Sequence, residues 1–184
     1  MASNSPMSDL RFRFMALTHD HALRRLVLNP AKLLQAAGIQ PGQQVLEVGC
    51  GPGFFTLPAA ELVGDAGCIH AIDLHPQAIE MVERKLQKAG LTNVQAAVAD
   101  AAQTGLPDAS VDLIVLFDVI HSLPMKQVLP EMVRVLRPGG AVAVMPRPRW
   151  SPITLTQGGS FAFVGQEGRV FNFRKEVSDE RSTL

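Results

Sequence analysis

The sequence has no tyrosine, a single tryptophan and only two cysteines, Cys50 and Cys68. Two cysteines at this separation form neither a disulfide framework nor a metal-ligand spacing. The chain is therefore expected to hold no metal ion. It is also expected to suit a reducing, cytoplasmic setting, where disulfides are rare.

Excess charge of one sign is also missing, because Lys plus Arg and Asp plus Glu both total 17. A dedicated nucleic-acid binder would usually carry a basic excess, so no nucleic-acid partner is expected. No apolar run approaches the ~20 residues that cross a bilayer. The polar start of the chain, residues 1–6, lacks the apolar core of a signal peptide. We expect a soluble protein without a membrane partner.

What the 184 residues do contain is an alternation of strand-like and helix-like segments. The expected strands are Gln44–Val48, Cys68–Ile72, Val94–Ala99, Val111–Phe117 and Ala141–Met145. The expected helices are Pro30–Ala37, Phe54–Val63, one from Pro76 to a stop at Gly90, and Pro124–Leu136. Such alternation implies right-handed crossovers and a parallel sheet. The fold class is therefore α/β, as a Rossmann-like three-layer sandwich.

The domain organisation is expected to be a single domain over residues 1–184. Residues 1–17 are expected to form a mobile arm, residues 18–38 the amino-terminal helices, and residues 44–146 a cofactor-binding core. Residues 160–174 alternate like a β-hairpin, with strands at 160–164 and 169–173 over a four-residue loop.

The stretch Val45–Thr56 has the pattern of a buried strand, a glycine-rich turn and a helix start. Glycine accepts positive φ and leaves room for a ligand against the backbone, so the turn predicts a nucleotide-cofactor site. Its spacing, Gly49-x-Gly51-x-Gly53, is one residue shorter than the dinucleotide pattern. Glu47 just before the turn would repel a pyrophosphate, and it would suit an ammonium or sulfonium group.

Acidic residues stand at the ends of four predicted strands: Glu47, Asp73, Asp100 and Asp118. Ligands of open parallel sheets bind beyond the carboxyl ends of the strands. We therefore expect these carboxylates to border one ligand site.

A series of segments carries a family likeness when taken in order. They are Val45–Thr56, Asp73, Ala99-Asp100, Leu106-Pro107 with Val111-Asp112, and Arg134–Gly140. Together they resemble the motifs of class I S-adenosylmethionine-dependent methyltransferases, of the small-molecule type with a Leu-Arg-Pro-Gly-Gly turn. The likeness runs over residues 30–146, and the terminal hairpin resembles the family's antiparallel strands six and seven. It implies a mostly parallel seven-stranded sheet with an antiparallel carboxyl-terminal hairpin.

The resemblance also implies a cofactor, S-adenosyl-L-methionine, with S-adenosyl-L-homocysteine as its product. The residues implied to bind it are Glu47, Gly49, Cys50, Gly51, Gly53, Asp73, Leu74, Asp100, Ala101 and Phe117. The glycines would border the methionine part and Glu47 its amino group. Asp73 would accept the two ribose hydroxyls, because a carboxylate has two oxygens to match a vicinal diol. Asp100 and an Ala101 amide would receive the adenine, and Phe117 would begin the wall beside the transferring methyl.

The acceptor side is expected just past the fourth strand, where Asp118 and His121 are the candidate catalytic residues. His121 titrates near neutral pH and could take a proton; a loop histidine bonded to backbone is the competing interpretation. Arg147, Arg149 and Trp150 follow the fifth strand, where this family commonly shapes its acceptor pocket. About a dozen residues separate that strand from the hairpin, so the usual helix there must be short or missing. The amino-terminal arm, or a second subunit of a homodimer, could complete the pocket.

The sequence thus predicts a methyltransferase acting on an unidentified small molecule. Two other functions remain open on the residues alone. One is a protein that binds S-adenosylmethionine or S-adenosylhomocysteine without turnover, as a regulatory or partner subunit. The other is an NAD(P)-dependent oxidoreductase, which the fold alone would allow.

Overall fold

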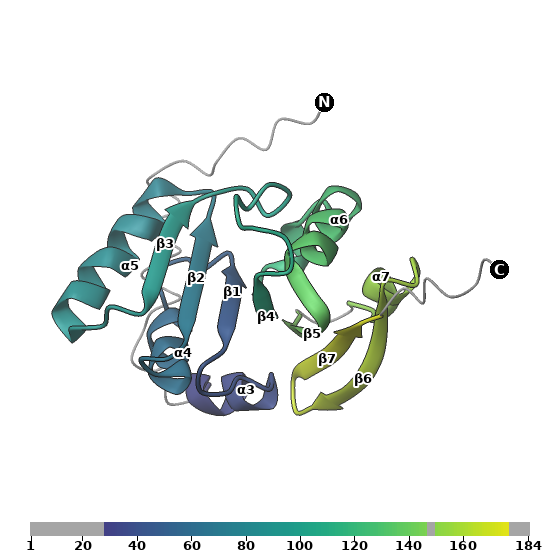
Figure 1. Cartoon of the computed structure of the whole chain (residues 1–184), viewed down its shortest axis with the longest axis horizontal. Helices are drawn as coiled ribbons and strands as arrows, with labels where there is room; N and C mark the ends of the chain where they lie inside the picture. Colours follow the sequence, from purple (N-terminus) through teal and green to yellow (C-terminus); the bar gives the residue numbers. More distant parts are fainter. Residues whose placement is uncertain (1–27, 147–149, 177–184) are drawn as a thin grey trace.

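The computed structural model describes residues 28–146 and 150–176. Figure 1 shows their strands and helices alternating along the chain. The helices are α3 (Pro30–Ala36), α4 (Thr56–Val63), α5 (Pro76–Ala89), α6 (Met125–Val135) and α7 (Ile153–Thr156), with a 3-10 turn, η1, at Ile120–Ser122. The strands are β1 (Gln44–Val48), β2 (Cys68–Asp73), β3 (Val94–Val98), β4 (Val111–Phe117), β5 (Leu136–Met145), β6 (Phe161–Glu167) and β7 (Val170–Lys175).

The seven strands form one sheet in the order β3-β2-β1-β4-β5-β7-β6. Strands β1 to β5 pair in parallel, and β7 runs antiparallel to both β5 and β6. The expected α/β fold, with a mostly parallel seven-stranded sheet and an antiparallel hairpin, is confirmed. The strand order reverses between β1 and β4, and ligands of such sheets bind at this switch point.

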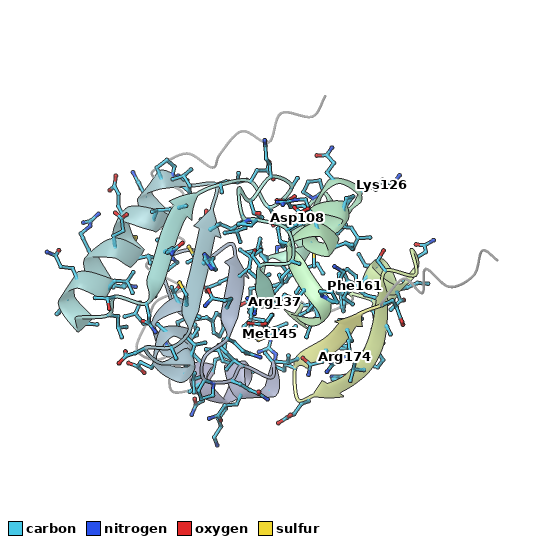
Figure 2. All side chains as sticks on the ribbon, viewed as in Figure 1. Asp108, Lys126, Arg137, Met145, Phe161 and Arg174 are labelled. Carbon is cyan, nitrogen blue, oxygen red and sulfur yellow. The ribbon has the colours of Figure 1, made fainter. Side chains whose placement is uncertain are left out.

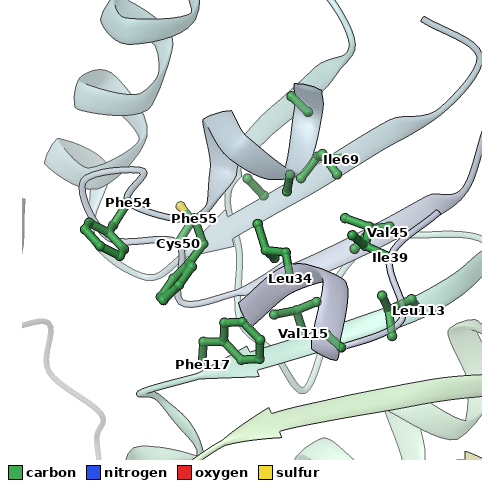
Figure 3. Packing of buried hydrophobic residues seen from close by; sticks show 14 of the residues in the cluster. Leu34, Ile39, Val45, Cys50, Phe54, Phe55, Ile69, Leu113, Val115 and Phe117 are labelled. Atoms are coloured by element: carbon green, nitrogen blue, oxygen red, sulfur yellow. The ribbon is translucent and has the colours of Figure 1, made fainter. Parts of the chain in front are cut away.

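Helices cover both faces of the sheet, which makes three layers (Figure 1). On one face, Leu34 of α3, Ala59 of α4 and Val82 of α5 join a buried hydrophobic cluster, part of which is drawn in Figure 3. On the other face, Met132 of α6 and Leu155 of α7 join a second cluster. Strand β4 feeds both clusters alternately, because successive side chains of a strand point to opposite faces.

The helix that follows β2 has clear local reasons for its bounds. At its start, the His75 ring accepts a hydrogen bond from the amide of Gln77 at 3.3 Å, and Pro76 occupies the first helical position. At its end, Gly90 takes a left-handed conformation with φ of 69°. Both bounds were predicted from the sequence.

The predicted start of the helix after the glycine turn was wrong. Phe54 and Phe55 remain in the turn, and α4 begins at Thr56. The two rings pack edge-to-face with centroids 4.8 Å apart, and both are buried. Neighbouring side chains diverge in a regular helix. A helix over these two residues would therefore not bury both rings.

The fifth strand begins at Leu136, five residues before its predicted start. Leu136 already pairs with Val111, and a register shift follows between Val111 and Leu113. The Arg-Pro-Gly-Gly stretch therefore lies within an irregular strand. Arg174 of β7 donates to the carbonyl oxygen of Gly139 at 2.9 Å, which links this stretch to the hairpin (Figure 2).

The hairpin loop is also shorter than predicted. Glu167 pairs with Val170, which leaves a two-residue loop in place of the expected four. Gly168 supplies the positive φ, 57°, that tight hairpin turns require.

Some expectations fall on residues outside the described ranges: the arm at 1–17, the helical segment at 18–27, and Arg147 and Arg149. The helix after β5 is short, as expected, since α7 has only four residues. Among the described helices, none combines the length and apolarity needed to cross a membrane.

Candidate functional site

The glycine-rich turn, residues 49–53, is anchored to the carboxyl end of β2. The amides of Gly49 and Cys50 donate to the carbonyl oxygen of Ile72 at 2.8 and 3.1 Å. The amide of Gly51 donates to Oδ2 of Asp73 at 2.9 Å. The turn therefore takes its shape from β2, and Asp73 lies where the two meet.

Asp73 is held by both of its carboxylate oxygens. While Oδ2 accepts from Gly51, Oδ1 accepts from the amide of His75 at 2.9 Å. These two backbone donors fix the carboxylate in the absence of any ligand. Each oxygen has a second lone pair, so the side chain can still accept from two further donors such as the hydroxyls of a vicinal diol.

All three glycines of the turn have positive φ, but an added side chain would meet different surroundings at each of them. A Cβ on Gly49 would lie 2.6 Å from Cγ2 of Val119, on the loop after β4. A Cβ on Gly53 would lie 3.1 Å from Cγ2 of Val82 on α5. A Cβ on Gly51 would meet nothing within 4 Å. Gly49 is thus required by packing, whereas Gly51 borders open space where a ligand could approach the backbone.

This difference predicts opposite results for two alanine substitutions. Gly49→Ala should lower the free energy of unfolding by about 2–4 kcal/mol, from the left-handed backbone and the clash with Val119. Gly51→Ala should cost only about 1 kcal/mol, but its methyl would occupy the ligand side and weaken S-adenosylhomocysteine binding. Urea denaturation and calorimetric titration measure the two effects. Equal stability losses in both variants would contradict the assignment.

Glu47 lies at the end of β1 and is buried, with 5% of its surface exposed. Oγ1 of Thr56 donates to its Oε2 at 2.6 Å. The pKa of Glu47 is raised to about 8, chiefly by burial; the Thr56 hydrogen bond opposes the shift and the charge of Asp73 adds to it. The carboxyl is therefore mostly protonated at neutral pH until a cation approaches it.

Cys50 lies buried within the turn. Burial raises the pKa of its thiol strongly, and the charges of Glu47 and Asp73 raise it further. A thiol kept protonated is a poor nucleophile, so Cys50 acts here as a small residue that fits the turn.

The ends of β2 and β3 present apolar surface between two carboxylates. Leu74 and Val98 are 43% and 53% exposed, and Val98 is the register partner of Asp73. Asp100 is exposed and its Oδ1 accepts from the amide of Ala102 at 2.8 Å, while Ala101 is buried. An exposed apolar surface flanked by Asp73 and Asp100 suits a flat ring that carries polar edges.

The end of β4 forms the other border of the turn. Phe117 is buried and its ring packs edge-to-face on Phe55, with centroids 4.9 Å apart (Figure 3). Asp118 follows with φ of 58°, and its amide donates to the carbonyl oxygen of Met145 at 2.9 Å. Left-handed backbone at a non-glycine residue is a strain that often marks functional sites. His121 is exposed in η1.

The motif residues at 106–112 and 134–140 do not join this site. Arg137 pairs with Asp112, whose other oxygen accepts from the amide of Gln44 at 2.8 Å, where β1 and β4 begin. Arg134 bonds to Glu131 at 2.8 Å and to Asp108, beside α6 in Figure 2. The Arg134 hydrogen bond, with others from Thr104, lowers the pKa of Glu131 to about 2. These motifs tie loops to the sheet at a distance from the carboxyl ends of the strands.

Sequence reasoning did not single out Thr56 or His75. Thr56 is fully buried and bonds to Glu47, and His75 supplies both the amide on Asp73 and the cap of α5. A polar residue opening an apolar helix was a signal for Thr56. Nothing in the sequence indicated the role of the His75 amide, since every residue but proline carries one. Within the described ranges, no group of three His, Cys, Asp or Glu side chains could hold a metal ion.

A family model described as a methyltransferase domain matches residues 45–140. The aklanonic acid methyltransferase of Streptomyces sp. strain C5 is 35% identical over 127 residues, which cover 68% of this chain and 54% of that protein. The demethylmenaquinone methyltransferase of Geobacillus stearothermophilus is 32% identical over 109 residues, covering 59% of this chain and 47% of that protein. The chain spans about half the length of these two relatives.

Among solved structures, a SAM-dependent methyltransferase from Aquifex aeolicus has the same fold, with a TM-score of 0.74. The match covers 92% of this chain and 98% of that one at 24% identity. The residues at the carboxyl ends of β1 and β2 fit S-adenosylmethionine, because Gly51 borders open space, Glu47 can balance a cation and Asp73 can accept a diol. With a family model that spans more than half of its 184 residues, the chain belongs to the methyltransferase domain family.

Proposed function

We propose that this protein transfers a methyl group from S-adenosylmethionine to a small-molecule acceptor and releases S-adenosylhomocysteine. The observation that carries the proposal is the fixed Asp73 carboxylate, which joins β2 to the glycine-rich turn beside the buried Glu47. The two relatives described above are named for aklanonic acid and demethylmenaquinone, which supports a small molecule as the acceptor class.

The proposed cofactor-binding residues are those expected from the sequence. Asp73 would hold the ribose, supported by the two oxygens that keep free lone pairs. Leu74, Asp100 and Ala101 would border the adenine, supported by the exposed apolar surface between the two acids. Gly51 and Glu47 would face the methionine part, with Gly49, Cys50 and Gly53 shaping the turn. Phe117 would form the wall next to the reacting methyl.

Bound S-adenosylmethionine supplies an activated methyl group on a sulfonium, so much of the rate can come from alignment and exclusion of water. The chain's own contribution would be to hold the acceptor over Phe117. A base is needed only where the acceptor arrives protonated. Asp118 and His121 are the proposed bases, supported by their place just after β4 and by the strained backbone of Asp118.

A homodimer and a cytoplasmic location belong to the same proposal. Phe163 and Val164 on β6 are 47% and 60% exposed, and β6 is the edge of the sheet. An open edge can pair with its copy about a two-fold axis, so a second copy of this chain is the proposed partner. Light scattering should give twice the mass of the 184-residue chain; the monomer mass would exclude the dimer.

The free thiols of Cys50 and Cys68 support a reducing compartment, such as the cytoplasm.

The direct test is formation of S-adenosylhomocysteine. The chain is incubated with methyl-labelled S-adenosylmethionine and a panel of small phenols, quinols, amines and carboxylic acids, and transfer of label is followed. Turnover with any acceptor supports the proposal and removes the alternative of binding without catalysis. Calorimetry that shows no binding of either S-adenosylmethionine or S-adenosylhomocysteine would overturn it.

A further inference from the structure

Helix α5 contacts the glycine-rich turn at two points. Nζ of Lys85 donates to the backbone carbonyl oxygen of Pro52, which lies between Gly51 and Gly53. One turn earlier on the same helix, Val82 is fully buried and faces Gly53, where a Cβ would lie 3.1 Å from its Cγ2. The helix thus supports the half of the turn that is farther from β2.

We propose that Lys85 is a positioning residue that holds Pro52 and Gly53 in the conformation that receives the amino-acid part of S-adenosylmethionine. The inference rests on the proposed function. The inference extends the proposed function, because it assigns part of the affinity for the amino-acid portion of the cofactor to a side chain on α5. This side chain lies outside every motif that the sequence resemblance supplied.

The two halves of the turn are held by different hydrogen bonds. Gly49, Cys50 and Gly51 all donate their amides to β2, through Ile72 and Asp73. Beyond Gly51, the amide of Gly53 donates back to Cys50 at 3.0 Å, which is a bond within the turn itself. The Lys85 bond connects this second half to a regular element of the fold.

The hydrogen bond from Lys85 should be strong enough to affect the conformation of the glycine-rich turn. Gly51 and Gly53 have φ of 51° and 80°, so both lie where glycine has wide freedom and the turn has many alternative conformations. A hydrogen bond from an ammonium group is charge-assisted and stronger than a neutral one. A lysine side chain is also long enough to reach the turn from α5. Loss of this bond should leave the second half of the turn less ordered.

The choice of ligands separates a local effect from a general one. S-adenosylhomocysteine and 5′-methylthioadenosine share adenine, ribose and a neutral sulfur, but only the first carries the amino-acid part. A residue that shapes the turn at Pro52 should matter for the first ligand alone. A residue that merely stabilises the fold should affect both equally.

The variants are Lys85→Met, Lys85→Arg and, as a matched control, Lys88→Met, which removes the same charge from an exposed position in the last turn of α5. Calorimetry should show S-adenosylhomocysteine binding to Lys85→Met about 10-fold more weakly, as expected for one lost charge-assisted bond. Binding of 5′-methylthioadenosine should change less than about 2-fold. Arginine should restore most of the affinity, and Lys88→Met should match the wild type.

A second measurement distinguishes positioning from direct contact with the ligand. In the ligand-free protein, Lys85→Met should speed amide hydrogen exchange at Gly53 and Phe54, while Ile69 in β2 stays protected as in the wild type. Unchanged exchange with weakened S-adenosylhomocysteine binding would mean direct contact and overturn the positioning role. Equal weakening of both ligands, or no weakening, would also overturn it. Wild-type protein that binds neither ligand would instead show that the proposed function has failed, and the inference with it.

Discussion

Asp73→Ala should lower the affinity for S-adenosylmethionine at least about 100-fold, since hydrogen bonds to a charged group contribute about 1.5–3 kcal/mol each. Two such bonds to the ribose hydroxyls would be lost. The change also removes the acceptor for the amides of Gly51 and His75, so the glycine-rich turn would lose one of its attachments to β2. Calorimetric titration measures the affinity, and hydrogen exchange of the Gly51 amide reports the turn.

Two further variants make this result interpretable. Asp73→Asn retains one acceptor oxygen and should bind with intermediate affinity. Asp65→Ala removes an acid from an exposed loop between α4 and β2, and should bind like the wild type. An Asp73→Ala protein that binds S-adenosylmethionine within about 5-fold of the wild type, a difference near 1 kcal/mol, would show that the ribose is held elsewhere.

Glu47→Gln should stabilise the ligand-free protein at pH 8 and weaken the binding of S-adenosylmethionine. Burial raises the pKa of Glu47 in the folded protein to about 8, above its ordinary value of 4.5. The folded state therefore holds the proton more tightly than the unfolded state, and the wild type loses stability as pH rises from about 4.5 to about 8. Glutamine cannot ionise and can still accept from Thr56. At pH 8 its advantage should be on the order of a few kcal/mol.

The same substitution should change how binding depends on pH. A cationic ligand favours the carboxylate, so wild-type Glu47 should release close to ~1 proton on binding S-adenosylmethionine at pH 7. Affinity should accordingly rise with pH between about 6 and 8. Glutamine should abolish both effects and bind about 10-fold more weakly or worse, since one charge-assisted bond is lost. Titration in two buffers of different ionisation enthalpy measures the proton release.

Glu131→Gln is a control, because the pKa of Glu131 is shifted in the opposite direction to that of Glu47. The Arg134 hydrogen bond lowers the pKa of Glu131 to about 2, so its stabilising contribution is present above pH 4.5 and is lost as pH falls towards 2. Glu131→Gln should destabilise the protein equally at pH 6 and pH 8, measured by urea denaturation. A Glu47→Gln protein whose stability advantage is the same at both pH values would show that Glu47 is already ionised at pH 6.

Sequence reasoning succeeded where local pattern decides the structure. The bounds of β4 were predicted to the residue, because Val111–Phe117 is a nearly continuous apolar run between turn residues. Predictions from the sequence were wrong where distant residues decide the bounds of a helix or strand. Phe54 and Phe55 leave the helix to bury their rings, and Leu136 extends β5 because Val111 is available to pair with it. Turn chemistry alone had placed that strand's start after the two glycines.

The candidate site, too, could be predicted only in part from the sequence. Acids at strand ends follow from topology, so Glu47, Asp73, Asp100 and Asp118 could be chosen from the sequence. The separate reasons for Gly49 and Gly51 could not, because they depend on Val119, a residue 70 positions away from Gly49. The protonated state of Glu47 also required the structure, because it is the burial of the carboxyl that chiefly raises its pKa.

The contact between Gly49 and Val119 restricts how this protein could be re-engineered for other acceptors under the proposed function. Val119 lies between the two candidate bases, on the loop that would face the acceptor, yet its side chain packs against the backbone of the donor turn. Enlarging Val119 to reshape the acceptor pocket would press on Gly49 and disturb the donor side as well. Specificity could be varied more freely near α7, where Ile153 is exposed. Libraries directed there should retain cofactor affinity that libraries at Val119 lose.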